Sequence, residues 1–248
     1  MFATLLIFTA LIFAQAASAN AGRITIYLAG DSTMAQKLPE KRPETGWGEM
    51  LGSFFRDGKV AIDNRAQNGR STRTFISEQR WQAIIDRLQP GDYVFIQFGH
   101  NDESKEKVDR YTPPADFRGN LVRFITEVRD KKGFPVLLTP LMRRRFDKAG
   151  QLQDTHGEYP DIVRNVAREY RVPLIDMHRS SAVVLGHYGP EESRKLFLQL
   201  KPNENPNYPK GIEDNTHFSP VGAEVMAGLA ADGIRSQKLG LARYLKRK

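Results

Sequence analysis

Short, nearly continuous apolar runs recur along the chain, and they constrain its fold more than any other feature. Runs of this length and composition are typical of strands that are buried on both faces. The run at 60–64 is weaker than the other four. The five expected strands are residues 24–29, 60–64, 92–98, 135–139 and 172–176.

Segments with helical spacing lie between and after these runs. The clearest apolar stripe consists of Phe117, Leu121, Phe124, Ile125 and Val128. Similar stripes cover residues 159–170 and 221–229, and the last follows Ser219 as a helix cap and Pro220 at the first helical position. Strands of this kind alternating with amphipathic helices predict an α/β fold, in which a parallel sheet is covered on both faces.

Composition limits the classes of binding partner and the kinds of chemistry that this chain can use. The 248 residues carry 37 Lys and Arg against 29 Asp and Glu, a formal charge of +8. This balance favours an anionic partner, which could be nucleic acid, a membrane surface or an acidic polymer. There is no cysteine, which excludes disulfides, cysteine-ligated zinc and thiol catalysis.

The N-terminal residues resemble an export signal. Phe2–Ala14 is an apolar run broken only by threonine, and Ala17-Ser18-Ala19 has the small residues of a cleavage site. We therefore expect a signal peptide over residues 1–19 with cleavage after Ala19, and a secreted or periplasmic protein. An N-terminal membrane anchor is the alternative. Residues 20–248 are expected to form a single domain with no membrane span.

Residues 186–211 are the least regular part of the sequence. Three prolines fall within eight residues of the run Lys201–Pro209, which excludes regular structure there. A domain linker is one interpretation, but little chain follows it. We expect a surface loop that returns the chain to the site.

Four polar clusters follow apolar runs or precede the last helix. They are Gly30-Asp31-Ser32, Asn68-Gly69-Arg70-Ser71-Thr72, Gly99-His100-Asn101-Asp102 and Asp214-Asn215-Thr216-His217. Ligands of such sheets bind beyond the carboxyl ends of the strands. Each cluster alone could be a turn or a helix cap. Together they predict one site.

The clusters contain the groups that acyl transfer needs. Ser32 becomes nucleophilic when His217 takes its proton, and Asp214 would orient and stabilise that imidazole. The backbone N–H groups of Ser32 and Gly69 and the amide of Asn101 would bind the oxyanion.

The remaining acidic and histidine residues are expected to be structural. Asp31 and Asp102 would hold their turns, and His100 would be an oriented residue at a strand end. We expect the other three histidines to lie at the surface, and no metal site; these histidines are His156, His178 and His187.

The four clusters together resemble the SGNH (GDSL-type) hydrolase superfamily. More specific motifs resemble its rhamnogalacturonan acetylesterase branch, over about residues 24–235. These motifs are Gly30-Asp31-Ser32-Thr33, Gly46-Trp47-Gly48, Asn68-Gly69-Arg70-Ser71, Gln97-Phe98-Gly99-His100-Asn101-Asp102, Thr139-Pro140, Arg143-Arg144-Arg145-Phe146 and Asp214-Asn215-Thr216-His217-Phe218.

The resemblance implies a three-layer α/β/α flavodoxin-like domain with about five strands. It also implies a serine esterase that removes acetyl groups from pectin without a cofactor. Ser32 matches the nucleophile, His217 the base and Asp214 its partner, and Gly69 and Asn101 match the oxyanion donors. The lack of cysteine departs from the disulfide-bearing fungal members.

The expected partner is an acetylated acidic polysaccharide, and we expect a monomer that binds no nucleic acid. Five arginines could contact substrate carboxylates, or could form a solvated basic face; they are Arg70, Arg73, Arg143, Arg144 and Arg145. Three other functions stay open: a lipid or aryl esterase, an esterase of another carbohydrate such as xylan, and a non-catalytic carbohydrate-binding protein.

Overall fold

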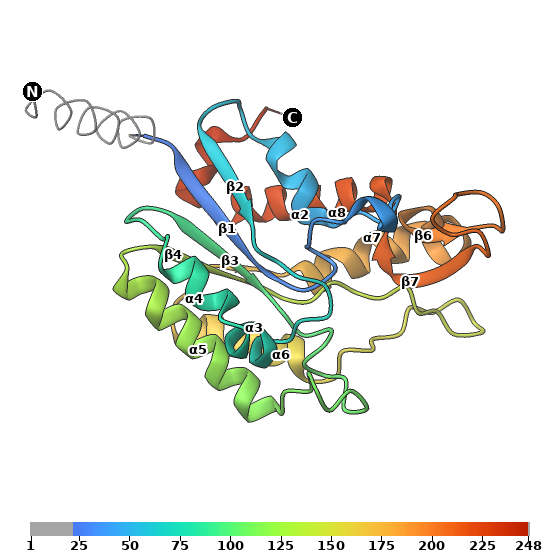
Figure 1. Ribbon diagram of the computed structural model, residues 1–248, viewed down its shortest axis with the longest axis horizontal. Helices are drawn as coiled ribbons and strands as arrows, with labels where there is room; N and C mark the ends of the chain where they lie inside the picture. The colour runs from blue at the N-terminus through green and yellow to red at the C-terminus, as the bar shows by residue number, and fades with distance from the viewer. Residues whose placement is uncertain (1–21, 248) are drawn as a thin grey trace, which may run out of the picture.

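A five-stranded parallel sheet runs through the centre of the computed structural model, which describes residues 22–247 (Figure 1). Its strand order is β2-β1-β3-β4-β5, so β1 lies between β2 and β3. The strands are β1 (Ile24–Gly30), β2 (Val60–Asn64), β3 (Tyr93–Gln97), β4 (Phe134–Leu138) and β5 (Leu174–Ile175). All five predicted strands are present, and the α/β fold with a parallel central sheet is confirmed.

Helices connect the strands. They are α2 (Trp47–Met50), α3 (Thr72–Ser77), α4 (Arg80–Ile85), α5 (Pro114–Asp130), α6 (Tyr159–Glu169), α7 (Met177–Glu192) and α8 (Pro220–Ser236). Short 3-10 turns are η1 (Pro39–Lys41), η2 (Leu51–Phe54), η3 (Ser193–Leu196) and η4 (Gly240–Tyr244). The three predicted stripes lie in α5, α6 and α8. In the described part of the chain, no helix has the length and apolarity needed to cross a membrane.

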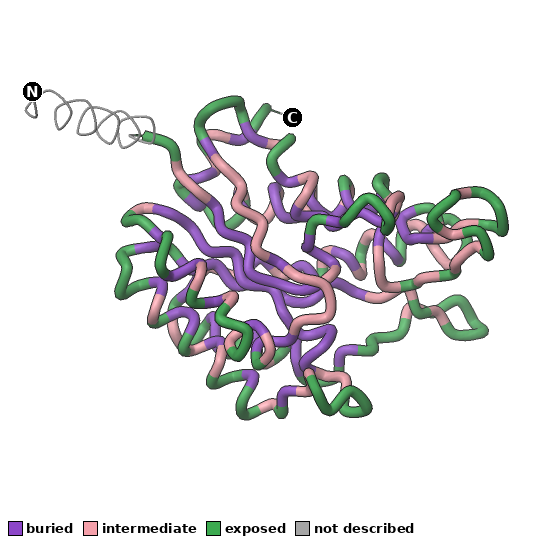
Figure 2. The backbone as a smooth tube through the Cα atoms, in the orientation of Figure 1, coloured by how far each residue is buried: buried purple, intermediate pink, exposed green. Residues whose placement is uncertain are grey.

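Most residues of the central strands are buried, as the purple stretches of the tube in Figure 2 show. Successive strand residues point to opposite faces of a sheet, and two separate cores result. Ile26 and Leu28 of β1 belong to the core that α8 covers, together with Met226 and Ala230. Tyr27 and Ala29 belong to the other core, which α5 and α6 cover. The molecule therefore has three layers.

Residues 186–211 are more regular than expected. Helix α7 continues to Glu192, with a kink where Gly189 adopts a φ of 68° before Pro190. The chain then forms β6 (Phe197–Leu200), which pairs antiparallel with β7 (Ile212–Phe218). Only the connection of this hairpin, over Lys201–Pro209, is irregular as predicted.

The hairpin corrects the predicted surface loop, because Asp214 and His217 lie within strand β7. Several residues of both strands are only partly buried, so the sequence lacks the continuous apolar run that marks a central strand. The end of β7 is tied to the body of the protein, where the backbone N–H of Thr45 donates to the carbonyl of Phe218 at 3.0 Å.

Helix α8 begins in close contact with the segment before β6. Ser219 caps the helix by accepting from the N–H of Gly222 at 3.1 Å, and its hydroxyl donates to the carbonyl of Lys195 at 2.7 Å. A Cβ atom on Gly222 would lie 1.7 Å from the carbonyl oxygen of Leu196. This position therefore has room only for glycine.

We predict that Gly222→Ala destabilises the protein by more than about 2 kcal/mol, because the helix must move away from Leu196 to admit the methyl group. Gly228→Ala in the same helix is the matched control, since its Cβ would meet nothing closer than 3.6 Å. This control should be neutral or more stable by about 0.5–1 kcal/mol. Urea unfolding measures both variants, and equal effects would contradict the close contact.

Candidate active site

The turn after β1 presents Ser32 and is held by a buried carboxylate. Asp31 accepts hydrogen bonds from the backbone N–H of Thr33 at 2.9 Å and from its hydroxyl at 2.8 Å. The other oxygen of Asp31 lies 3.2 Å from Nδ1 of His100. Ser32 itself is only half-buried. Asp31 and His100 thus have the structural positions that the sequence suggested for them.

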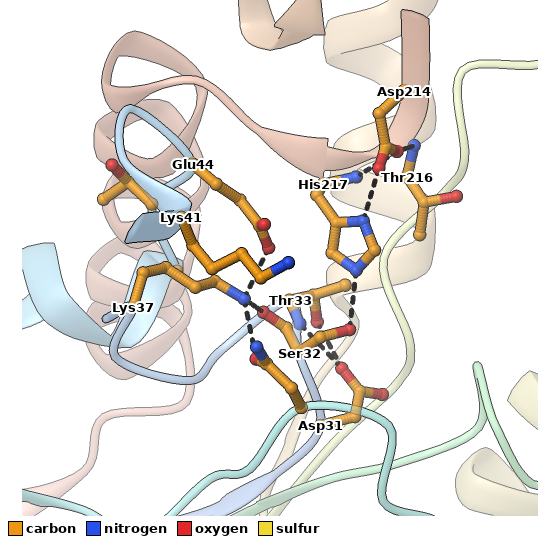
Figure 3. Close-up of polar contacts among 12 residues, drawn as sticks. Asp31, Ser32, Thr33, Lys37, Lys41, Glu44, Asp214, Thr216 and His217 are labelled. Carbon is orange, nitrogen blue, oxygen red and sulfur yellow. Dashed lines mark hydrogen bonds and ion pairs between the residues drawn. The ribbon is translucent and has the colours of Figure 1, made fainter. Parts of the chain in front are cut away.

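Ser32, His217 and Asp214 form a continuous hydrogen-bonded chain (Figure 3). The imidazole Nε2 of His217 lies 2.8 Å from Oγ of Ser32, and its Nδ1 lies 2.7 Å from Oδ2 of Asp214. The first two residues are 185 positions apart in the sequence. The fold therefore brings together the three residues that the sequence pattern nominated for nucleophile, base and orienting carboxylate.

Asp214 is held as an anion. Its Oδ1 accepts from the backbone N–H groups of Thr216 at 2.7 Å and His217 at 2.9 Å. Burial alone would raise the pKa of Asp214, but the hydrogen bond and charge of His217 and these two N–H groups lower it below the usual value. An ionised carboxylate fixes the tautomer of the imidazole and stabilises its protonated form.

The three expected oxyanion donors each keep an N–H group that is free for a ligand. Among residues 22–247, the backbone N–H groups of Ser32 and Gly69 donate to no other protein atom. The side-chain amide of Asn101 donates to the carbonyl of Arg70 at 3.1 Å, which leaves its second N–H for a ligand. Gly69 adopts a φ of 75°, a conformation that favours glycine.

The buried side chain of Asp102 links the polar cluster after β3, to which it belongs, to the cluster at residues 68–72. One oxygen of its buried carboxyl accepts from the N–H of Thr72 at 2.9 Å and from its hydroxyl at 2.6 Å. Burial raises the pKa of Asp102 to about 7, although the Thr72 hydrogen bonds act in the opposite direction. These contacts bind the loop of Gly69 to that of Asn101, which agrees with the structural role expected for Asp102.

The expectation that His156 and His178 lie at the surface is wrong; only His187 is exposed. His156 is 1% exposed and His178 9%. Nδ1 of His156 lies 2.8 Å from Oε2 of Glu103, and its Nε2 lies 2.7 Å from the carbonyl oxygen of Leu141. These partners come from distant segments, so the local sequence gave no sign of them. Within residues 22–247, no three histidine or acidic side chains are grouped as metal ligands.

Lys37 was not predicted, yet its ammonium group contacts the turn that carries Ser32. Its side chain is 0% exposed and forms an ion pair with Oε1 of Glu44 at 2.7 Å. The ammonium group also donates to the carbonyl of Ser32 and, at 2.9 Å, to Oδ1 of Asn68 (Figure 3). Lys37 therefore ties the nucleophile turn to the loop that carries Gly69.

Four of the five candidate arginines have partners within the protein. Arg70 is paired with Glu78 at 2.9 Å, and Arg73 donates to the carbonyl of Val108. Arg143 and Arg144 have internal partners: Arg143 pairs with Glu103 and donates to the carbonyl of His100 at 3.2 Å, and Arg144 donates to Ser193 at 3.1 Å and to Asn215 at 2.8 Å. Arg145 is exposed.

These contacts favour structural roles for Arg143 and Arg144. Another arginine, which the sequence did not single out, lies beside the proposed oxyanion donors. It is Arg110, whose Nη1 is 3.5 Å from Oδ1 of Asn101.

The chain is similar in sequence to known proteins. A family model described as GDSL-like lipase/acylhydrolase matches residues 28–225. The chain is 45% identical over 222 residues to the rhamnogalacturonan acetylesterase RhgT of Bacillus subtilis, covering 90% of this chain and 94% of RhgT. It is 38% identical over 217 residues to the probable rhamnogalacturonan acetylesterase YesY of the same organism, covering 87% and 94%.

The chain is also similar to a solved structure. That of the Bacillus subtilis protein YxiM has a TM-score of 0.75 at 26% identity, and the match covers 88% of this chain and 58% of YxiM. The chain thus spans somewhat more than half of that solved protein.

The buried charge of Asp31 gives a prediction for stability against pH. Burial alone would raise its pKa, but the charge and hydrogen bond of His100 and the hydrogen bonds of Thr33 lower it to about 2. Since an unfolded aspartate titrates near 3.9, Asp31 stabilises the folded state above about pH 4. That contribution is lost as the pH falls toward 2.

Asp31→Asn should therefore be less stable than the wild type by about 2 kcal/mol at pH 6. The difference should shrink as the pH is lowered from about 4 toward 2, as measured by urea unfolding across this range. A difference that stays constant with pH would mean that the asparagine disturbs packing and that charge is not the cause.

Lys37 gives a prediction that separates stability from positioning. Lys37→Met leaves Glu44 buried without its partner and should cost about 3 kcal/mol of stability. The double variant Lys37→Met/Glu44→Gln should recover most of that stability. The kcat of this double variant should stay roughly ten- to hundredfold below that of the wild type, with little change in KM. The reason is that no side chain then links the Ser32 turn to Asn68. If kcat recovers together with stability, Lys37 only holds the fold.

Proposed function

The chain belongs to the GDSL-like lipase/acylhydrolase family, and we propose that it is a serine esterase that removes O-acetyl groups from rhamnogalacturonan, a pectic polysaccharide. The observation that carries this proposal is the hydrogen-bonded series Ser32–His217–Asp214 beside the donors of Gly69 and Asn101. Such an arrangement activates a hydroxyl for attack on an ester carbonyl. It is a carboxylic-ester hydrolase.

The proposed reaction has two steps. In the first, Oγ of Ser32 attacks the acetyl carbonyl while His217 takes the hydroxyl proton. The tetrahedral oxyanion accepts hydrogen bonds from the N–H groups of Ser32 and Gly69 and from Asn101. When the intermediate collapses, the C–O bond to the sugar breaks and His217 protonates the sugar oxygen. The acetyl group is then on Ser32.

In the second step, His217 takes a proton from water, and the resulting hydroxide attacks the acetyl-serine. Collapse of the second tetrahedral intermediate returns the proton to Ser32 Oγ and releases acetate. Asp214 accepts a hydrogen bond from Nδ1 of His217 throughout, so that the imidazolium formed in each step is stabilised. No cofactor enters the proposed sequence.

The choice of substrate rests on two observations. The relative RhgT, which bears the name of a rhamnogalacturonan acetylesterase, is 45% identical over nearly the whole length of both chains. The net charge of +8 suits a polymer rich in galacturonate, because cationic proteins attract polyanions. A lipid or aryl esterase, a xylan esterase and a non-catalytic carbohydrate-binding protein are the alternatives to be tested.

We also propose that the protein is exported, with residues 1–19 as the signal peptide and cleavage after Ala19. The support comes from the sequence alone, because these residues lie outside the described part of the chain. Export would bring the enzyme to a polysaccharide of plant cell walls. N-terminal sequencing of the protein recovered from the medium or the periplasm tests the cleavage site.

The function is tested by acetate release from acetylated rhamnogalacturonan and from acetylated xylan, and by 4-nitrophenol release from a long-chain 4-nitrophenyl ester. We expect kcat/KM on rhamnogalacturonan to exceed the other two at least tenfold. Ser32→Ala should lower kcat by roughly 10³-fold or more, because it removes the nucleophile, while the thermal unfolding curve stays unchanged.

Each alternative has its own outcome. A preference for xylan or for the long-chain ester would contradict the proposed substrate, while the proposed esterase activity would still hold. Activity of Ser32→Ala within tenfold of the wild type would place the nucleophile elsewhere. Binding of rhamnogalacturonan without any acetate release would make the protein a carbohydrate-binding one.

A further inference from the structure

Arg110 lies on a braced segment between β3 and α5. Its backbone N–H donates to the carbonyl of Lys107 at 3.0 Å, and its carbonyl accepts from the hydroxyl of Thr112 at 3.2 Å. Thr112 is in turn fixed by its N–H bond to the carbonyl of Asp102 at 2.9 Å and by a hydrogen bond from the Tyr159 hydroxyl at 2.7 Å. The base of the Arg110 side chain is therefore held in place.

The guanidinium group of Arg110 stands at the edge of the proposed oxyanion hole. Its Nη1 is 3.5 Å from Oδ1 of Asn101. The same nitrogen would lie 3.0 Å from a Cβ atom on Gly69, so it covers the α-carbon of that residue. Two of the three proposed oxyanion donors thus have the same cation as a neighbour.

The guanidinium group of Arg110 makes only weak contacts with other protein groups. Its carboxylate partner is the adjacent Asp109, at 3.2 Å, whose side chain is 69% exposed. The side chain of Arg110 is itself 29% exposed. An exposed ion pair of this kind contributes little, and guanidinium has five N–H donors. Arg143, by contrast, pairs with the largely buried Glu103.

We propose that Arg110 binds the carboxylate of a uronic acid residue when its acetyl group, or that of a neighbouring sugar, enters the oxyanion hole. This inference rests on the proposed function and gives it a specificity residue. A planar guanidinium can bind a carboxylate through two parallel hydrogen bonds. Asp109 is then displaced by the substrate carboxylate. Arg110 does not touch the reacting atoms, so it selects the substrate and is not catalytic.

The test uses acetylated rhamnogalacturonan oligosaccharides whose carboxyl groups are either free or methyl-esterified. For the wild type we expect kcat/KM to be roughly tenfold higher on the free acid, because a hydrogen bond to a charged group is lost on esterification. Arg110→Met should lose that preference and leave the methyl ester and 4-nitrophenyl acetate within about twofold of the wild type. Arg110→Lys should keep part of the preference, because the positive charge remains.

Arg129→Met is the matched control. Arg129 is an exposed arginine near the end of α5, where it donates to the carbonyl of Tyr170 at 2.8 Å. The segment after it leads into the start of β4, so it lies at the edge of the sheet opposite the site. Its replacement removes the same charge and should leave the preference for the free acid intact.

Galacturonate and galactose as inhibitors of 4-nitrophenyl acetate hydrolysis give a second readout that does not depend on the polymer. Galacturonate should inhibit the wild type more strongly than galactose does, and Arg110→Met should remove this difference. If the wild type does not deacetylate rhamnogalacturonan but galacturonate still inhibits in this way, the proposed function fails and the carboxylate site stands.

Two results would overturn the role of Arg110. Equal losses on the free acid, the methyl ester and 4-nitrophenyl acetate would mean that Arg110 acts by positioning Asn101. A wild type that does not distinguish the free acid from the methyl ester would mean that no carboxylate is recognised at this place.

Discussion

The parallel pairing of β1 with both β2 and β3 is the constraint on which the site depends. It brings the carboxyl ends of three strands to one edge, so the segments that carry Ser32, Gly69 and Asn101 leave the sheet side by side. Buried polar contacts then fix the spacing of these segments: Asp31 with His100, Asp102 with Thr72, and Lys37 with Asn68. The segments that carry the three proposed oxyanion donors are therefore held in place by the protein itself.

Most of the strands and long helices could be predicted from the sequence, because each is marked by a local pattern of apolar residues. Apolar runs mark the five strands, and the stripes in α5, α6 and α8 mark the long amphipathic helices. Helices α3 and α4 have six residues each, too few to show a period. The hairpin of β6 and β7 is partly exposed and has no continuous apolar run, so Asp214 and His217 could be placed beside the site but not on a strand.

Polar residues whose burial the sequence did not reveal have at least one partner in a distant segment. Lys37 pairs with the nearby Glu44 but also donates to Asn68, 31 residues away, and His156 contacts Glu103, 53 residues away. Lysine is rarely fully buried unless it is paired, and no pattern in the sequence announces such a pair. The same holds for Arg143, which a basic tripeptide presents as a surface charge although Glu103 holds it. Charge pairs between distant segments form only in the folded chain, so local sequence patterns do not predict them.

The division of the proposed triad between two parts of the fold has a consequence in time. Ser32 follows β1, the first strand of the described residues 22–247, whereas His217 and Asp214 lie on β7, in a separate hairpin with β6. A nascent chain holds Ser32 long before it holds His217. The proposed activity thus requires the hairpin to be synthesised and docked beside the β1 turn, so its appearance would report that these two distant parts of the chain have met.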